Sequence, residues 1–297
     1  MNNSISRRHF LISTPGLAAM APAGSLNASD NLPLPSSNVS RTGDGYVNPR
    51  RVLLWESTRK EIREALESGR LKAAILPTGS TEQHNEHLAM IQDTASAVLL
   101  AQQAALRLYP QVIVSTPVPV GISPYWMERK GTLTLRPETF LAMVFDICDS
   151  LRTHGIKTLF IVNGHGGNDK PLKDFLPDLR TKLGIHIDAC SYWEAYSASE
   201  EIKQEVRKVM QSGLEKVPGH SGEFETSVAL AAFPERIHRE GVDYEKIHLA
   251  LKDPEDSKTD RSYYYDSLLA RPEKGEALIR IAVDWVAEKL RGMIAQS

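Results

Sequence analysis

The run Ala73-Ala74-Ile75-Leu76-Pro77 is followed by Glu82-Gln83-His84-Asn85-Glu86-His87 and then by Asp93. The short apolar run predicts a buried strand. The polar part brings five side chains that can bind a metal or transfer a proton into twelve residues. Carboxylates and imidazoles are the ligands that divalent metals select, and burying several of them together is costly because like charges repel. The stretch therefore indicates a metal site, with an ordinary solvated acidic loop as the alternative.

Helix and strand patterns alternate along the chain from about residue 50. Short apolar strands separated by helices predict an α/β fold with a mainly parallel sheet covered on both faces. The strands are expected at 73–77, 112–118, 158–162 and 185–192, and the helices at 58–68, 93–108, 137–153, 170–183, 223–233 and 273–295.

Two polar clusters follow two of these strands. Glu82 and His84 come after the first, and Asn163-Gly164-His165-Gly166-Gly167-Asn168 comes directly after another. Ligands of open parallel sheets bind at the carboxyl ends of the strands, so both clusters are expected at one edge of the sheet. The second cluster on its own is also typical of a glycine-rich connector.

A third cluster, His220-Ser221-Gly222-Glu223-Phe224-Glu225, opens an apolar helix pattern. It adds an imidazole and two carboxylates to the candidate ligands and acid/base groups. The helix dipole alone also favours carboxylates at such a position, so each cluster taken singly is weak.

Composition excludes several classes of protein. With 24% charged residues and a formal net charge of −2, the chain gives no reason to expect a nucleic-acid partner. Cys148 and Cys190 are the only cysteines, so there is no disulfide framework.

The N-terminal residues Ser6-Arg7-Arg8-His9-Phe10-Leu11 carry the twin-arginine export pattern, followed by a weakly apolar run over 11–23. That run is shorter than the roughly 20 residues that span a membrane, so no stable membrane anchor is expected. We expect a signal peptide over 1–28, a linker over 29–48, the functional domain over 49–297, and export to the periplasm. A chance arginine pair is the alternative.

From about Ala73 to the C-terminal helix the sequence resembles the creatininase (creatinine amidohydrolase) family. Several ordered motifs make this a specific match. They are Pro77-x-Gly79-Ser80-x-Glu82-Gln83-His84-x-x-His87-Leu88 with Asp93, the loop 163–168, His220-x-Gly222-x-x-Glu225-Thr226-Ser227, and the weaker blocks Gly131-Thr132 and Glu273-Lys274-Gly275.

The resemblance implies a three-layer α/β/α domain, commonly a hexamer, with a hydrolytic site of one or two divalent metals. Glu82, Asp93 and His165 match the ligands of one metal. His84 matches a ligand of the other, with Asp93 bridging the pair. His220 matches the histidine that transfers protons. Zinc, manganese and iron all suit such oxygen and nitrogen ligands.

Departures from the family pattern are also informative. Creatinine-hydrolysing members carry a glutamate where this chain has Gly167, which leaves one metal a ligand short. Glu223 is expected to restore that ligand, its rival role being a charge that complements the helix dipole. Glu225 is expected to serve with His220 as a spare acid/base group.

Other departures concern the substrate. Asn85-Glu86 stands where the family usually has Gly-Pro, Trp126 replaces a histidine, and Arg129-Lys130 replaces an apolar pair. We expect Glu86, Trp126 and Arg129 to contact a small-molecule substrate other than creatinine. A core or oligomer contact for Trp126 and a solvated turn at 129–130 are the alternatives.

The expected chemistry is metal-assisted hydrolysis, in which a metal lowers the pKa of bound water from 15.7 towards about 7 and hydroxide attacks a carbonyl. His220 would then protonate the leaving group. The first substrate class is a cyclic amide or another non-peptide C–N bond. The alternative is a C–C or ester bond in a cyclic keto-sugar or lactone. A periplasmic metal- or solute-binding protein without turnover is a further alternative, against which His220 and Glu225 argue.

Overall fold

The computed structural model describes residues 52–238 and 266–296. The expected signal peptide (1–28), the linker (29–48) and most of the charged, tyrosine-rich segment after residue 240 lie outside the described residues. Within the described part of the chain, no helix combines the length and apolar character that crossing a membrane requires.

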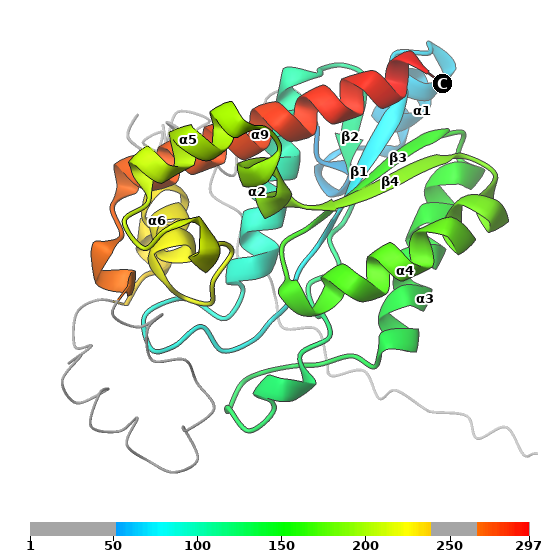
Figure 1. The fold of residues 1–297 in the computed structure, drawn as a ribbon. Coiled ribbons are helices and arrows are strands. Elements are labelled where there is room, and N and C mark those ends of the chain that lie inside the picture. The colour runs from blue at the N-terminus through cyan, green and yellow to red at the C-terminus, as the bar shows by residue number, and fades with distance from the viewer. Residues whose placement is uncertain (1–51, 239–265, 297) are drawn as a thin grey trace, which may run out of the picture. The chain divides into compact units, whose positions relative to one another are not determined.

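The sheet has four parallel strands in the order β2-β1-β3-β4 (Figure 1). Ala73 pairs with Val112 on one side and with Thr158 on the other, so the first three strands start at a common level. The predicted parallel sheet is confirmed. The strands are β1 (Ala73–Thr78), β2 (Val112–Val114), β3 (Thr158–Asn163) and β4 (His186–Ser191).

One strand is shorter than its apolar pattern predicted. The pattern extends to residue 118, but β2 ends at Val114 and pairing resumes only as an isolated bridge between Thr78 and Val118. Pro117 and Pro119 lie in this segment, and proline has no N–H to donate to a neighbouring strand.

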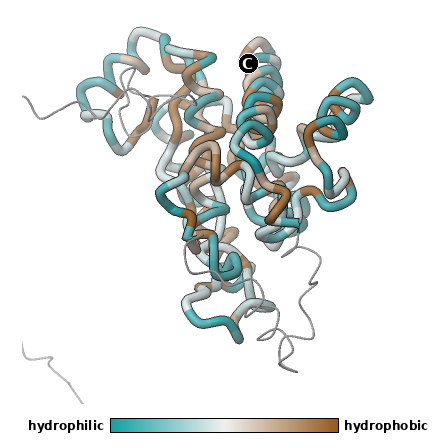
Figure 2. Tube along the Cα trace, turned by 90° about the vertical axis from the view of Figure 1, so that its left-hand side faces the viewer, coloured by the Kyte–Doolittle hydropathy of each residue, from teal (hydrophilic) through white to brown (hydrophobic). Residues whose placement is uncertain are grey.

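Side chains alternate between two hydrophobic cores, one on each face of the sheet. Ile75 and Phe160 point into one core, while Leu76 and Ile161 point into the other, and all four are buried. The helices alternate hydrophilic and hydrophobic segments along their length, as expected for elements with one buried face (Figure 2). The first core is covered by α2 (Gln92–Arg107), α6 (Glu223–Ala232) and α9 (Pro272–Ala295), and the second by α3 (Pro137–Thr153) and α4 (Gly166–Leu183). The molecule therefore has the three α/β/α layers that the family resemblance implied.

Shorter elements complete the described residues. The N-cap residue of helix α1 (Arg59–Glu67) is Thr58, whose side chain and that of Glu61 form a capping box. Helix α5 (Glu200–Val209) was not predicted from the sequence. The 3-10 helices are η1 (Leu54–Glu56), η2 (Pro124–Trp126), η3 (Tyr192–Ser197), η4 (Leu214–Lys216), η5 (Pro234–Arg236) and η7 (Ser267–Leu269).

Helix α4 starts four residues earlier than predicted. The helix was expected from residue 170, but it begins at Gly166 and includes Pro171 and Pro177. The glycine-rich loop is therefore partly the first turn of α4, and His165 is its N-cap residue. This brings His165 to the carboxyl edge of the sheet.

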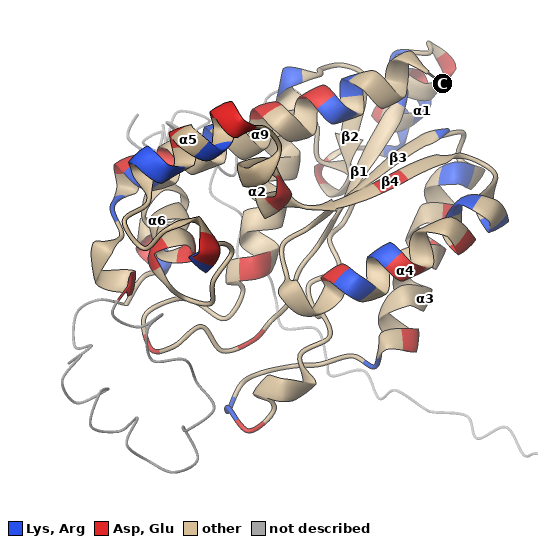
Figure 3. Cartoon of the chain, in the orientation of Figure 1, with Lys and Arg blue, Asp and Glu red and all other residues tan. Residues whose placement is uncertain are grey.

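Charged residues of both signs are interspersed along α4, α5 and α9 (Figure 3). On α4, Lys170 pairs with Asp174 and Lys173 pairs with Asp169, each at a spacing of four residues. Such exposed pairs contribute little to stability, and their mixed signs do not form a single-sign binding face on these helices.

Candidate metal centre and active site

The candidate ligands meet where three helices begin. Asp93 lies in the first turn of α2, His165 precedes α4, and Glu225 lies in the first turn of α6. Glu82 and His84 come from the loop after β1. Each helix N-terminus carries a partial positive charge, so the arrangement favours buried carboxylates.

His165 is oriented by a backbone carbonyl. Its Nε2 lies 3.1 Å from the Ile122 carbonyl oxygen, which accepts the ring N–H. Its Nδ1 therefore keeps a free lone pair, and this atom lies 2.8 Å from Asp93 Oδ2 and 3.5 Å from Glu82 Oε1. A lone pair that faces two carboxylate oxygens needs a cation between them.

His84 is held in the same way through its other nitrogen. Its Nδ1 lies 3.1 Å from the Glu82 carbonyl oxygen, so its Nε2 is left to face the carboxylates. That Nε2 lies 2.9 Å from Asp93 Oδ1 and 3.5 Å from Glu225 Oε2. Asp93 thus uses one oxygen for each histidine, which suits a carboxylate that bridges two sites.

The ligand atoms form overlapping groups whose members all lie within 4.8 Å of one another. One group is Glu82, Asp93 and His165, and another is His84, Asp93 and Glu225. Within the described residues, Glu82 Oε2 and Asp93 Oδ2 are buried and accept no hydrogen bond. Orphaned carboxylate oxygens are costly unless a cation satisfies them, so the donor set fits a divalent metal pair.

The pKa values indicate the same need for positive charge. Burial raises the pKa of Glu225 to about 8, and Asp93 adds to this effect. Burial lowers the pKa of His84, but Asp93 and Glu225 outweigh burial and raise that pKa to about 10. Burial and Asp93 raise the pKa of Glu82. Without a metal, protons neutralise the centre.

Glu223 does not join this centre, which corrects the expectation that it completes the ligand set. Its carboxylate accepts the backbone N–H groups of Gln211 and Ser212 at 2.7–3.1 Å and forms an ion pair with Lys274. These contacts turn it away towards α9. Glu225, expected as an acid/base group, occupies the position beside His84 and Asp93 instead.

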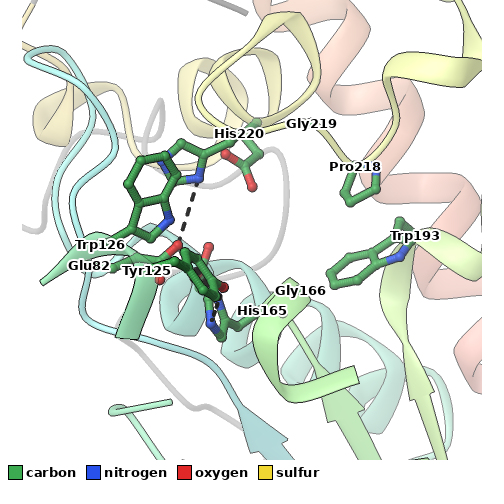
Figure 4. A pocket seen from close by; sticks show the side chains of 12 residues that line it. Glu82, Tyr125, Trp126, His165, Gly166, Trp193, Pro218, Gly219 and His220 are labelled. Atoms are coloured by element: carbon green, nitrogen blue, oxygen red, sulfur yellow. Dashed lines mark hydrogen bonds and ion pairs between the residues drawn. The ribbon is translucent and has the colours of Figure 1, made fainter. Parts of the chain in front are cut away.

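A cavity of about 180 Å³ opens above these ligands. Trp126 and Tyr125 stand on one side of it, with His220, and Trp193 and Pro218 stand on the opposite side (Figure 4). The Trp126 and His220 rings stack, with centroids 4.6 Å apart and planes inclined by 23°.

Of the expected substrate contacts, the structure brings only Trp126 to this cavity. Arg129 and Glu86 are not among the residues that line it, and Glu86 is exposed. The departures from the family pattern that singled out these two residues carry no information on the direction of a side chain.

Other residues of the cavity were missed. Trp193 lies two residues after the end of β4, so the rule that sites lie at the carboxyl ends of strands could have found it. Tyr125, whose hydroxyl lies 3.3 Å from His165 Nε2, carries no sequence signal beyond its neighbour Trp126. His87 is buried and bonds to the Thr226 hydroxyl at 2.9 Å, so it ties α6 to the β1 loop.

The sequence model of the creatininase family, described as creatinine amidohydrolase, matches residues 55–290. The chain belongs to the creatininase family. Among characterised relatives, the 3-dehydro-scyllo-inosose hydrolase of Thermotoga maritima is 28% identical over 65% of this chain and 60% of its own length. The creatinine amidohydrolase of Pseudomonas putida is 26% identical over 82% of this chain and 97% of its own. The mycofactocin precursor peptide peptidase of Mycobacterium ulcerans matches 36% of this chain at 29% identity.

Solved creatininase structures share the fold. One creatininase crystal structure superposes with a TM-score of 0.65 and 24% identity, covering 81% of this chain and 96% of the other. A manganese form superposes with a TM-score of 0.64, and a zinc–zinc form of a variant with 0.66. Creatininases of this fold have thus been observed with either metal.

Gly167 is closely surrounded by neighbouring atoms. A Cβ atom here would lie 2.1 Å from the Ile122 carbonyl oxygen and 2.6 Å from His165 Nε2. The glutamate that creatinine-hydrolysing members carry at this position therefore has no room in this loop. Glu225 reaches the same two ligands, His84 and Asp93, from α6.

Proposed function

We propose that this creatininase-family hydrolase depends on a divalent metal pair and cleaves a C–N bond in a small cyclic amide or a related non-peptide substrate. The observation that carries the proposal is Asp93, whose two oxygens face Nε2 of His84 and Nδ1 of His165, the ring nitrogens that no backbone carbonyl occupies. A bound divalent ion supplies a Lewis acid and brings the pKa of its water from 15.7 to about 7. Zinc, manganese and iron all suit this donor set.

Different residues of the chain bind the two ions. Glu82, Asp93 and His165 hold one ion, and His84 and Glu225 share Asp93 to hold the other. The ligands are buried, so their geometry is fixed before a substrate arrives.

The cavity favours a small ring. Its volume of about 180 Å³ suits a single ring, and Trp126 and Trp193 offer flat walls on opposite sides. Among the described residues, its lining includes three carboxylates and neither lysine nor arginine. These carboxylates are the proposed metal ligands, so bound divalent ions would offset their charge.

A second candidate is hydrolysis of a C–C or ester bond in a cyclic keto-sugar or lactone. The relative from Thermotoga maritima, named for a keto-inositol substrate, favours this candidate. The apolar faces of such rings also pack on the walls formed by Trp126 and Trp193.

Zinc- and manganese-loaded protein should be incubated with two compound sets, cyclic amides and keto-sugars with lactones, and the products identified by mass spectrometry. We expect ring-opened or deaminated products from the amide set, lost when metal is removed with chelator. Products from the keto-sugar set alone would replace the first candidate with the second. Unchanged turnover in chelator would contradict the metal dependence.

We also propose export through the twin-arginine route and assembly as a homo-oligomer. The Arg7-Arg8 pair and the apolar run after it support export, because that route carries proteins that are already folded and metal-loaded. Family membership supports assembly. Fractionation of cells carrying Arg7→Lys with Arg8→Lys, and light scattering of the purified protein, test the two statements.

A further inference from the structure

The ring of His220 is held by contacts on several sides. Its Nε2 lies 2.8 Å from the side-chain Nε2 of Gln83, and its Nδ1 lies 3.7 Å from Glu82 Oε1. Trp126 stacks on the ring, and the His84 ring lies 4.6 Å away on centroids, inclined by 36°. With the ring held, its chemistry depends on which nitrogen carries the proton.

The orientation of the Gln83 amide answers that question. Gln83 Oε1 accepts the backbone N–H of Asn85 at 3.0 Å, so the amide nitrogen is the end that faces His220. Turning the amide over would break this bond and point an NH₂ group at the Asn85 N–H. An amide nitrogen only donates, so Nε2 of His220 must accept.

We propose that Gln83 is a positioning residue that holds His220 as the tautomer protonated on Nδ1, which makes His220 an N–H donor to the substrate and excludes it as a metal ligand. The donor role rests on the proposed hydrolysis, whereas the tautomer does not. A doubly protonated ring is disfavoured too, because its Nε2–H would meet the amide N–H of Gln83 at 2.8 Å.

The three histidines of the site differ in the group that hydrogen-bonds to one of their ring nitrogens. In His84 and His165 a backbone carbonyl accepts one ring N–H, which leaves the other nitrogen bare towards the carboxylates. In His220 an amide donor occupies one nitrogen, which leaves an N–H on the other. Glu82, His84 and His220 lie close enough to resemble a third metal group, but the Nδ1 proton excludes coordination by His220.

In the reaction, an N–H at Nδ1 donates a hydrogen bond to the carbonyl oxygen or to the leaving atom of a substrate in the cavity. It does not accept a proton from the attacking water, because the only lone pair of the ring is bound to Gln83. A neutral histidine that donates in this way stabilises negative charge as it develops.

Neutron diffraction from deuterium-exchanged crystals of the zinc-loaded protein tests the proposal, because it locates the exchanged protons. We expect deuterium on Nδ1 of His220 and none on its Nε2. Deuterium on Nε2, or zinc at about 2.1 Å from a nitrogen of His220, would overturn it. Absence of zinc from the site would contradict the proposed function but leaves the His220 proton visible, so the two failures are distinguishable.

Neutron diffraction from the variants Gln83→Glu and Gln83→Met tests whether Gln83 determines which nitrogen of His220 carries the proton. The glutamate carboxylate accepts a hydrogen bond, so deuterium should move to Nε2 of His220 in Gln83→Glu. Methionine keeps the side-chain length but neither donates nor directs the proton, so the preference for Nδ1 should weaken. A bare Nε2 in Gln83→Glu would overturn the role of Gln83, even if Gln83→Met fails to crystallise.

Discussion

Glu223 and Lys274 form an ion pair between the start of α6 and the start of α9, with Glu223 buried and Lys274 mostly so. The two oxygens of Glu223 also accept the backbone N–H groups of Gln211 and Ser212. Two residues further along α6, Glu225 faces the metal centre. We therefore expect these neighbouring glutamates of one helix turn to differ in function, with Glu223 acting in folding and Glu225 in the proposed metal binding.

Glutamine substitutions separate these functions. Glu223→Gln should keep the wild-type metal content and lose about 1–3 kcal/mol of unfolding free energy, because Lys274 stays buried without its counter-charge. Glu225→Gln should lose one of two bound ions and keep its stability in chelator. Elemental analysis with chemical denaturation measures both. Loss of metal in Glu223→Gln alone would reverse the assignment.

The variant Asp93→Asn tests whether the Asp93 carboxylate binds both ions. Asp93 contacts His84 through one oxygen and His165 through the other, so its loss should affect both ions. We expect zinc to fall below about 0.5 equivalents, compared with about one in Glu225→Gln. Equal metal contents in the two variants would show that Asp93 does not bridge.

Gly167→Ala tests how tightly the loop closes over His165. The added Cβ would lie 2.1 Å from the Ile122 carbonyl oxygen, so the loop must shift. We expect a cost of about 1–3 kcal/mol in unfolding free energy. Gly166→Ala is the matched control, since a Cβ there meets nothing within 4 Å. The melting temperatures of the two variants are compared by thermal unfolding. Equal melting temperatures would contradict the close packing around Gly167.

Metal affinity should rise with pH. Burial and Asp93 raise the pKa of Glu225 to about 8, and the carboxylates raise that of His84 to about 10 against the effect of burial. Both groups hold protons at pH 6 that a metal must displace, so zinc binding should tighten by about tenfold per pH unit for each proton released. Calorimetric titration between pH 6 and 8, in buffers with different ionisation enthalpies, counts these protons. A dissociation constant that does not change with pH would contradict the linkage.

Much of this site could be predicted from local sequence. Glu82, His84 and His165 follow two neighbouring parallel strands, and strand order alone brings them to one edge. Glu223 could not be placed in this way, because its partner Lys274 lies 51 residues further along the chain. Both glutamates follow the same helix-start pattern, and only the packing of α9 on α6 distinguishes them.

The start of α4 and the lining of the cavity also could not be predicted from local sequence. The start of α4 was predicted at residue 170, but the helix begins at Gly166, inside the glycine-rich loop that packs against neighbouring backbone. Arg129 and Glu86 were expected in the cavity because they depart from the family pattern. Whether these two side chains face the cavity depends on the local backbone conformation, which the sequence does not specify.

The paired metal centre is tested most directly by anomalous diffraction at the zinc edge from crystals of the zinc-loaded protein. We predict two peaks about 3.5–4 Å apart, with Asp93 between them, His165 on one and His84 with Glu225 on the other. A peak beside Glu223, or no peak at the Asp93 carboxylate, would contradict the account.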